Sequence, residues 1–165
     1  MDVRRAGHGQ LELVVAILEE ASDWMRRTSG GGWDPGQFPS EVVTHGRLWR
    51  AYEDGDLYLA WEDGRPVATM TLQWQDELFW PDAPDDAGYV HRLAVASDAH
   101  GRGIGRDLLR WAEREALARG KRFLRLDTSA ENPSLRRYYE GAGFELKDER
   151  MVGRWNVVLY ERPLP

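Results

Sequence analysis

Apolar residues in the N-terminal part of the chain recur every three or four positions. This spacing predicts an amphipathic helix over residues 10–27, and its apolar face consists of Leu11, Val14, Val15, Leu18, Ala21 and Met25. The glycine run at 30–32 is expected to end that helix. A second helix is predicted from a Pro-Ser-Glu start signal at residue 39 to about residue 53, although it contains Gly46.

The middle of the chain has the shorter period of β-strands. Strands are predicted at 57–61 and 66–72, and the Asp63-Gly64 turn between them indicates an antiparallel hairpin. A polar loop leads to a third predicted strand at 89–95. Alternation of apolar and polar residues therefore predicts a sheet in this region.

A strand-turn-helix-strand unit follows. The predicted helix at 103–119 has an apolar face formed by Ile104, Leu108, Trp111, Ala112 and Ala116. Gly120 stands where a helix end is expected, and a strand is predicted at 123–127. A further helix at 133–140 and strands at 144–150 and 156–161 complete the expected elements.

Length and composition limit the class of protein. A chain of 165 residues with 42% hydrophobic and 30% charged residues is expected to form a single domain, residues 1–165. The chain has no cysteine, so we expect no disulfide, no thiolate metal site and a cytoplasmic location; no other metal site is expected. The net charge of -6 argues against binding of nucleic acid or of an anionic membrane surface. The lack of a long apolar run argues against a membrane span.

Alternate glycines open the predicted helix at 103–119. Gly101, Gly103 and Gly105 follow a strand directly, and such a turn exposes backbone N–H groups at the positive end of a helix dipole. The turn therefore favours binding of a pyrophosphate, and a flexible or tightly packed structural turn is the alternative. Their spacing fits neither the dinucleotide fingerprint nor the ATP-binding loop, which argues against a dinucleotide-dependent oxidoreductase.

A second motif lies between Asp127 and Phe144, with an asparagine before a helix and a tyrosine seven residues later. Together with the segment 92–95 and the glycine turn, it resembles the GNAT superfamily of acyl-CoA-dependent N-acetyltransferases over residues 57–161. The resemblance implies an α/β (α+β) fold. Its expected core is a mixed, mostly antiparallel sheet flanked by helices, with a splayed central strand pair.

The resemblance also implies where acetyl-CoA binds. Gly103 and Gly105 take the two fixed positions of the family's pyrophosphate signature, and His100 stands where glutamine or arginine is usual. Arg102 and Arg106 are additional candidate phosphate partners, or solvated arginines. The expected acetyl-CoA-binding residues are Leu93, Val95, His100, Gly101, Arg102, Gly103, Ile104, Gly105, Arg106 and Asn132.

Candidate catalytic residues follow from the same resemblance and from the chemistry of the reaction. Tyr139 matches the tyrosine that protonates the departing CoA thiolate. A base must also remove a proton from the acceptor's ammonium group, directly or through water. Asp127, His91 and Tyr89 are the candidates, and a strand-end cap or core packing is the alternative for each.

Several aromatic and charged segments bear on the acceptor. The loop 74–86 has five carboxylates and three large aromatic residues, which fits a cationic or aromatic amine or a solvated loop pinned to the core. Trp24, Trp33 and Phe38 are further candidates for the acceptor pocket. The arginines at 26, 27 and 154 favour an anionic group instead.

The predicted function is therefore transfer of an acetyl group from acetyl-CoA to a primary amine of a small molecule or peptide, without a covalent enzyme intermediate. The alternative is a non-catalytic acyl-CoA-binding or interaction module of the same fold. Antibiotics, polyamines, amino acids and protein N-termini are all possible acceptors. A homodimer is possible, because dimers are common in this superfamily.

Overall fold

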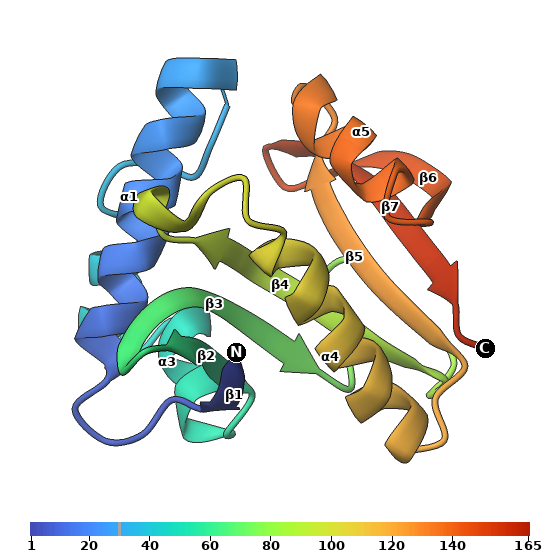
Figure 1. Cartoon of the computed structure of the whole chain (residues 1–165). Helices are drawn as coiled ribbons and strands as arrows, with labels where there is room; N and C mark the ends of the chain where they lie inside the picture. The colour runs from blue at the N-terminus through green and yellow to red at the C-terminus, as the bar shows by residue number, and fades with distance from the viewer. Residues whose placement is uncertain (30) are drawn as a thin grey trace. The chain divides into compact units, whose positions relative to one another are not determined.

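The computed structural model describes residues 1–29 and 31–165 and divides into two compact units. The first unit consists of residues 1–72 and 92–109, and the second of residues 73–91 and 110–165. Gly30, the first of the glycines expected to end the N-terminal helix, lies outside the described residues. Figure 1 follows the chain from β1 in blue to β7 in red.

The first unit contains strands and helices from the N-terminal part of the chain. Its helices are α1 (Leu11–Ser29), α2 (Gln37–Val43) and α3 (Arg47–Glu53), and its strands are β1 (Asp2–Arg5), β2 (Leu57–Glu62) and most of β3 (Arg65–Gln73). β1 pairs with β2, and β2 with β3, both antiparallel. The predicted hairpin is therefore confirmed.

The core of the first unit lies between α1 and β2. Val14, Leu18 and Ala21 are buried as predicted, together with Ile17, against Leu57 and Leu59 of β2. These residues lie on one face of α1, so burial of that face holds the helix on the sheet. Leu11 and Val15 are half-buried at its margin.

The single helix predicted at 39–53 is wrong, because the chain forms α2 and α3 instead. His45 has a φ of 53°, a left-handed conformation that interrupts the helix, and Gly46 precedes α3. The carboxylate of Glu41 accepts a hydrogen bond of 2.8 Å from the N–H of Leu48 in the first turn of α3. A side chain of α2 thus satisfies a free amide of α3, which stabilises the break.

The second unit contains the C-terminal strands. β5 (Phe123–Ser129) pairs antiparallel with β7 (Trp155–Pro163), and β7 with β6 (Glu145–Val152). β4 (Ala87–Val95) pairs parallel with β5 over Ala87–Val90 and Phe123–Leu126. Figure 1 shows β5 beside β7, with α5 (Pro133–Glu140) over them, and Tyr139 of α5 lies 6.4 Å from Tyr160 of β7, measured between ring centroids.

Two elements continue from one unit into the other. β4 belongs to the second unit up to His91 and to the first unit after it. α4 (Ile104–Ala118) belongs to the first unit up to Leu109 and to the second unit after it. The predicted apolar face of α4 is confirmed, since Ile104, Leu108, Ala112 and Ala116 are buried, and Trp111 is half-buried. Within the described residues, no helix is both long and apolar enough to span a bilayer.

Candidate functional site

The glycine turn of the first unit connects a short 3-10 helix (Ser97–Ala99) to the start of α4. Gly101 and Gly103 have φ angles of 76° and 80°, in the left-handed region that glycine adopts without strain. A Cβ atom built on Gly103 meets nothing within 4 Å, so a side chain there would project into open space. The first N–H groups of α4 lack partners within the helix, so this turn can bind an anion.

The side chain of His100 contacts the protein rather than open space. Its Nε2–H donates a hydrogen bond of 2.9 Å to the carbonyl of Val95, and its ring meets Trp24 edge to face at 4.7 Å. The imidazole of His100, which was expected to contact a phosphate, is therefore hydrogen-bonded to Val95, the last residue of β4, in the structure. Arg102, another predicted phosphate partner, forms an ion pair with Glu62.

The second unit brings His91 and Asp127 together, as their places on two neighbouring strands suggest, and adds Asp76. The Nδ1 atom of His91 lies 3.2 Å from Oδ1 of Asp127, and its Nε2 atom lies 3.1 Å from Oδ2 of Asp76. The side chains of Asp76, His91 and Asp127 are 6%, 13% and 15% exposed. We call these three residues the carboxylate-histidine cluster.

Charge attraction decides the protonation of this cluster. Burial alone would lower the pKa of His91, but its contacts with Asp127 and Asp76 raise that pKa to about 9. Burial alone would raise the pKa of Asp76, yet His91 and two backbone amides lower it. At neutral pH, His91 is therefore an imidazolium between two carboxylates.

The cluster should make stability depend on pH. The rise of the His91 pKa from 6.5 to about 9 corresponds to roughly 3 kcal/mol. This contribution is fully present below pH 6.5 and is lost as the pH rises through 9. Because the pKa of Asp76 is lowered, its contribution is present above its usual pKa of 3.8 and is lost as the pH falls below that value.

We therefore expect His91→Gln to reduce the free energy of unfolding more at pH 6 than at pH 10. Urea unfolding of the wild type and the variant at both pH values measures this difference. An equal loss at both pH values would show that His91 is not held as a cation in the folded protein.

The three side chains of the cluster offer ligand atoms within 4.8 Å of one another. An imidazole binds a metal ion through one of its nitrogens. In this cluster each ring nitrogen already faces a carboxylate oxygen, at 3.1 Å for Asp76 and 3.2 Å for Asp127. The arrangement favours ion pairs.

Tyr139 lies on α5, and Asn132 directly precedes this helix. Tyr139 is 8% exposed, and burial, Tyr138 and the charge of Asp127 raise its pKa. Asn132, a predicted acetyl-CoA contact, is 1% exposed and its Oδ1 accepts a hydrogen bond of 3.1 Å from the N–H of Leu135. This bond caps the start of α5 and so fixes the helix that carries Tyr139.

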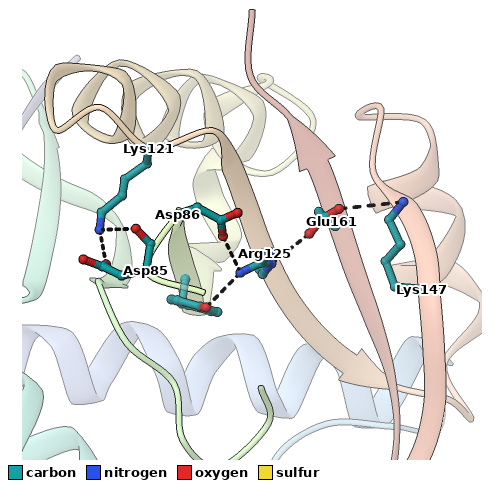
Figure 2. Close-up of polar contacts among 7 residues, drawn as sticks. Asp85, Asp86, Lys121, Arg125, Lys147 and Glu161 are labelled. Atoms are coloured by element: carbon teal, nitrogen blue, oxygen red, sulfur yellow. Dashed lines mark hydrogen bonds and ion pairs between the residues drawn. The ribbon is translucent and has the colours of Figure 1, made fainter. Parts of the chain in front are cut away.

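Tyr89 belongs to a network of charges around the buried Arg125 that was not predicted from the sequence. Its hydroxyl accepts a hydrogen bond of 3.0 Å from Arg125, which also lies 3.0 Å from Asp86 and 2.8 Å from Glu161. Figure 2 shows Arg125 between these two carboxylates, with Lys147 on the far side of Glu161. Parallel pairing places Tyr89 opposite Arg125. Tyr89 therefore contacts Arg125, whereas His91 contacts Asp127.

Most charged and aromatic groups of the loop 74–86 already have partners. Asp76 contacts His91, Asp85 pairs with Lys121, and Asp86 pairs with Arg125, the last two being drawn in Figure 2. Arg119 stacks on Trp74 at 4.2 Å, and Phe79 is buried. These contacts support the interpretation of a loop pinned to the core over that of an open acidic pocket for a cationic or aromatic amine.

The aromatic residues of the first unit do not form one surface. Phe38 is fully buried in the core, and Trp33 packs against it at 5.1 Å between ring centroids. Trp24 is 42% exposed and contacts His100 beside the glycine turn. Of these three candidates for an acceptor pocket, Trp24 alone is exposed.

Comparison with known proteins adds independent evidence. The model of a family described as the acetyltransferase (GNAT) family matches residues 17–144. The chain is 26% identical over 139 residues to YesJ of Bacillus subtilis, described as an uncharacterized N-acetyltransferase, covering 81% of this chain and 76% of YesJ. It is 33% identical over 107 residues to S-(2-succino)cysteine N-acetyltransferase of the same organism, covering 62% of each.

Solved structures agree. The PaiA N-acetyltransferase from Thermoplasma acidophilum, determined in complex with coenzyme A, matches with a TM-score of 0.75 and 16% identity over 98% of both chains. At that identity the similarity establishes the fold. It confirms the predicted class of a mixed, mostly antiparallel sheet with flanking helices.

Proposed function

Because the chain belongs to the acetyltransferase (GNAT) family, we propose that it transfers an acetyl group from acetyl-CoA to a primary amine of a small molecule or peptide. The protein is an acyltransferase, as its family and relatives show. We further propose that residues 1–165 form a single acetyltransferase domain, since the match at 17–144 includes residues of both compact units.

The proposed binding of acetyl-CoA rests on the glycine turn. Gly101, Gly103 and the following amides offer backbone N–H donors to the pyrophosphate, and the open space in front of Gly103 leaves room for it. Ile104 is buried and anchors the turn, while Gly105 and Arg106 continue into the first turn of α4. Leu93 and Val95 remain the proposed backbone partners of the pantetheine arm.

The observation that carries the proposed chemistry is the contact of Asp127 with His91 inside a buried cluster. His91 is protonated at neutral pH and has no lone pair with which to accept a proton. Asp127 is a carboxylate, so we assign it as the group that takes the proton of the acceptor's ammonium, directly or through water. Tyr89 is held by Arg125 and is assigned a supporting role.

The neutral amine then attacks the thioester carbonyl. A carbon–nitrogen bond forms, the carbon–sulfur bond breaks, and the CoA thiolate takes a proton from Tyr139. The amine loses its second proton as the amide forms, and this proton replaces the one that Tyr139 gives up. The charge of Asp127 raises the pKa of Tyr139, so protonation of Asp127 makes Tyr139 a stronger acid when the thiolate leaves.

Release of free CoA thiol tests this function. Wild-type protein is incubated with acetyl-CoA and a panel of amines that includes polyamines, amino acids and peptides with free N-termini. We expect thiol release and an N-acetylated product with at least one acceptor. Binding of acetyl-CoA without thiol release for any amine would instead favour a non-catalytic acyl-CoA-binding module.

The assignment of the base predicts a change in the pH profile. In the wild type, kcat/KM should fall toward acid when the catalytic base is blocked, and Asp127→Asn should remove that limb. The profile is measured with two acceptors whose amine pKa values differ. A limb caused by ionisation of the acceptor shifts with the amine pKa, whereas a limb caused by the enzyme stays at the same pH. An unchanged acid limb and full rate in Asp127→Asn would assign deprotonation to solvent or another residue.

A further inference from the structure

Asp76 is the most buried member of the carboxylate-histidine cluster, and it comes from the loop between β3 and β4. Its side chain is 6% exposed. One oxygen, Oδ1, accepts a hydrogen bond of 3.1 Å from the N–H of Phe79, and the other, Oδ2, lies 3.1 Å from Nε2 of His91. Asp76 therefore connects the backbone of its loop to the ring of His91.

The ring of His91 is fixed from several sides. Asp127 faces Nδ1, Asp76 faces Nε2, and the ring of Phe79 lies 5.9 Å away between centroids. The backbone of Phe79 is tied in turn by a hydrogen bond from Arg150 of β6 to its carbonyl. Rotation of the imidazole would break both of its ion pairs, so the two carboxylates define one ring orientation.

We propose that Asp76 is a positioning residue for acetyl transfer: by holding Nε2 of His91, it keeps the Nδ1 side of the ring against Asp127, so that Asp127 stays aligned to receive the acceptor's proton. This proposal rests on the proposed function of the same cluster. Asp76 acts through His91 and does not itself touch the reacting atoms.

The charged surroundings of His91 support this assignment. Asp76 and Asp127 are the carboxylates that face the ring, from the β3–β4 loop and from β5. Tyr139 on α5 is within the electrostatic range of Asp127, and Arg150 on β6 meets the loop at Phe79. With Asp76 neutral, Asp127 would be the one carboxylate left among these groups to stabilise the imidazolium.

Asp76→Asn tests the proposal, and Asp82→Asn is the matched control because Asp82 is an exposed carboxylate of the same loop. The first measurement is the titration of the His91 ring nitrogens by 15N NMR, assigned with His91→Gln. We expect a midpoint near pH 9 in the wild type and in Asp82→Asn. Loss of one carboxylate partner should lower the midpoint in Asp76→Asn by about one pH unit or more.

The second measurement is kcat/KM for acetyl-CoA against pH in the same proteins, followed by thiol release. The wild type should lose activity as His91 deprotonates near pH 9, and this alkaline limb should move toward neutral pH in Asp76→Asn by the same amount as the NMR midpoint. Asp82→Asn should keep the wild-type profile. A variant damaged only in its packing would lose rate without moving the limb.

Three results would overturn the proposal. A wild-type His91 midpoint near 6.5 would show that Asp76 does not hold a cation, even if Asp76→Asn failed to fold. A shifted midpoint with an unshifted rate profile would remove Asp76 from catalysis and leave the proposed acetyl transfer intact. No thiol release by the wild type with any amine would end both proposals, whatever the NMR titration showed.

Discussion

Gly103→Val should abolish binding of acetyl-CoA and of free CoA while the protein remains folded. Gly103 has a φ of 80°, and a Cβ at this position meets no protein atom within 4 Å. The valine side chain would therefore occupy the open space that we assign to the pyrophosphate, in front of the amides at the start of α4. Isothermal titration calorimetry with CoA measures the loss.

Backbone strain is the other effect of this substitution, because a β-branched residue at positive φ is unfavourable. Gly120→Val is the matched control. Gly120 has a φ of 69°, an added Cβ also meets nothing within 4 Å, and the residue follows the opposite end of α4. This control should keep wild-type affinity for CoA. Unchanged CoA affinity in a folded Gly103→Val protein would disprove the assignment of the turn.

Tyr139→Phe should lower kcat by roughly ten- to a thousandfold and leave the affinity for acetyl-CoA nearly unchanged. The substitution removes the hydroxyl and keeps the ring, which packs against Phe144 at 5.9 Å and against Tyr138 at 5.3 Å between centroids. Burial raises the pKa of Tyr139, so the wild-type residue carries its proton in the free enzyme.

Tyr138→Phe is the control for Tyr139→Phe, because it removes a hydroxyl from the neighbouring residue of the same helix. Steady-state rates of thiol release with saturating acetyl-CoA compare the two variants. A pre-steady-state burst experiment shows whether chemistry limits turnover. If chemistry is limiting and Tyr139→Phe retains the wild-type kcat, Tyr139 has only a packing role.

Elements with local start and stop signals were predicted well, and elements that depend on contacts with distant residues were predicted poorly. The helix at Pro133–Glu140 has the predicted bounds, because the proline start and the glycine stop are both local signals. β1 was not predicted, since Asp2–Arg5 is mostly exposed and pairs with β2 through its backbone. The break at His45 depends on Glu41 accepting from the amide of Leu48, a contact that periodicity does not reveal.

The residues of the candidate site also differ in how far the sequence alone could identify them. His91 and Asp127 could be nominated because both lie on predicted strands next to recognisable motifs. Asp76 is one of five carboxylates in its loop, and no local feature separates it from the others. Arg125 could not be matched to Tyr89 without the register of β4 and β5, which depends on tertiary pairing.

Direct transfer of the acetyl group to an amine can be tested in a single turnover. Enzyme in excess over [13C]acetyl-CoA is mixed with an acceptor found in the amine panel, quenched at intervals, and analysed by mass spectrometry of the protein and the small molecules. We predict that labelled N-acetyl product and free CoA thiol appear together, with the mass of the protein unchanged. Labelled acetyl on the protein before acceptor is added, or release of labelled acetate in place of an N-acetylated amine, would contradict direct transfer.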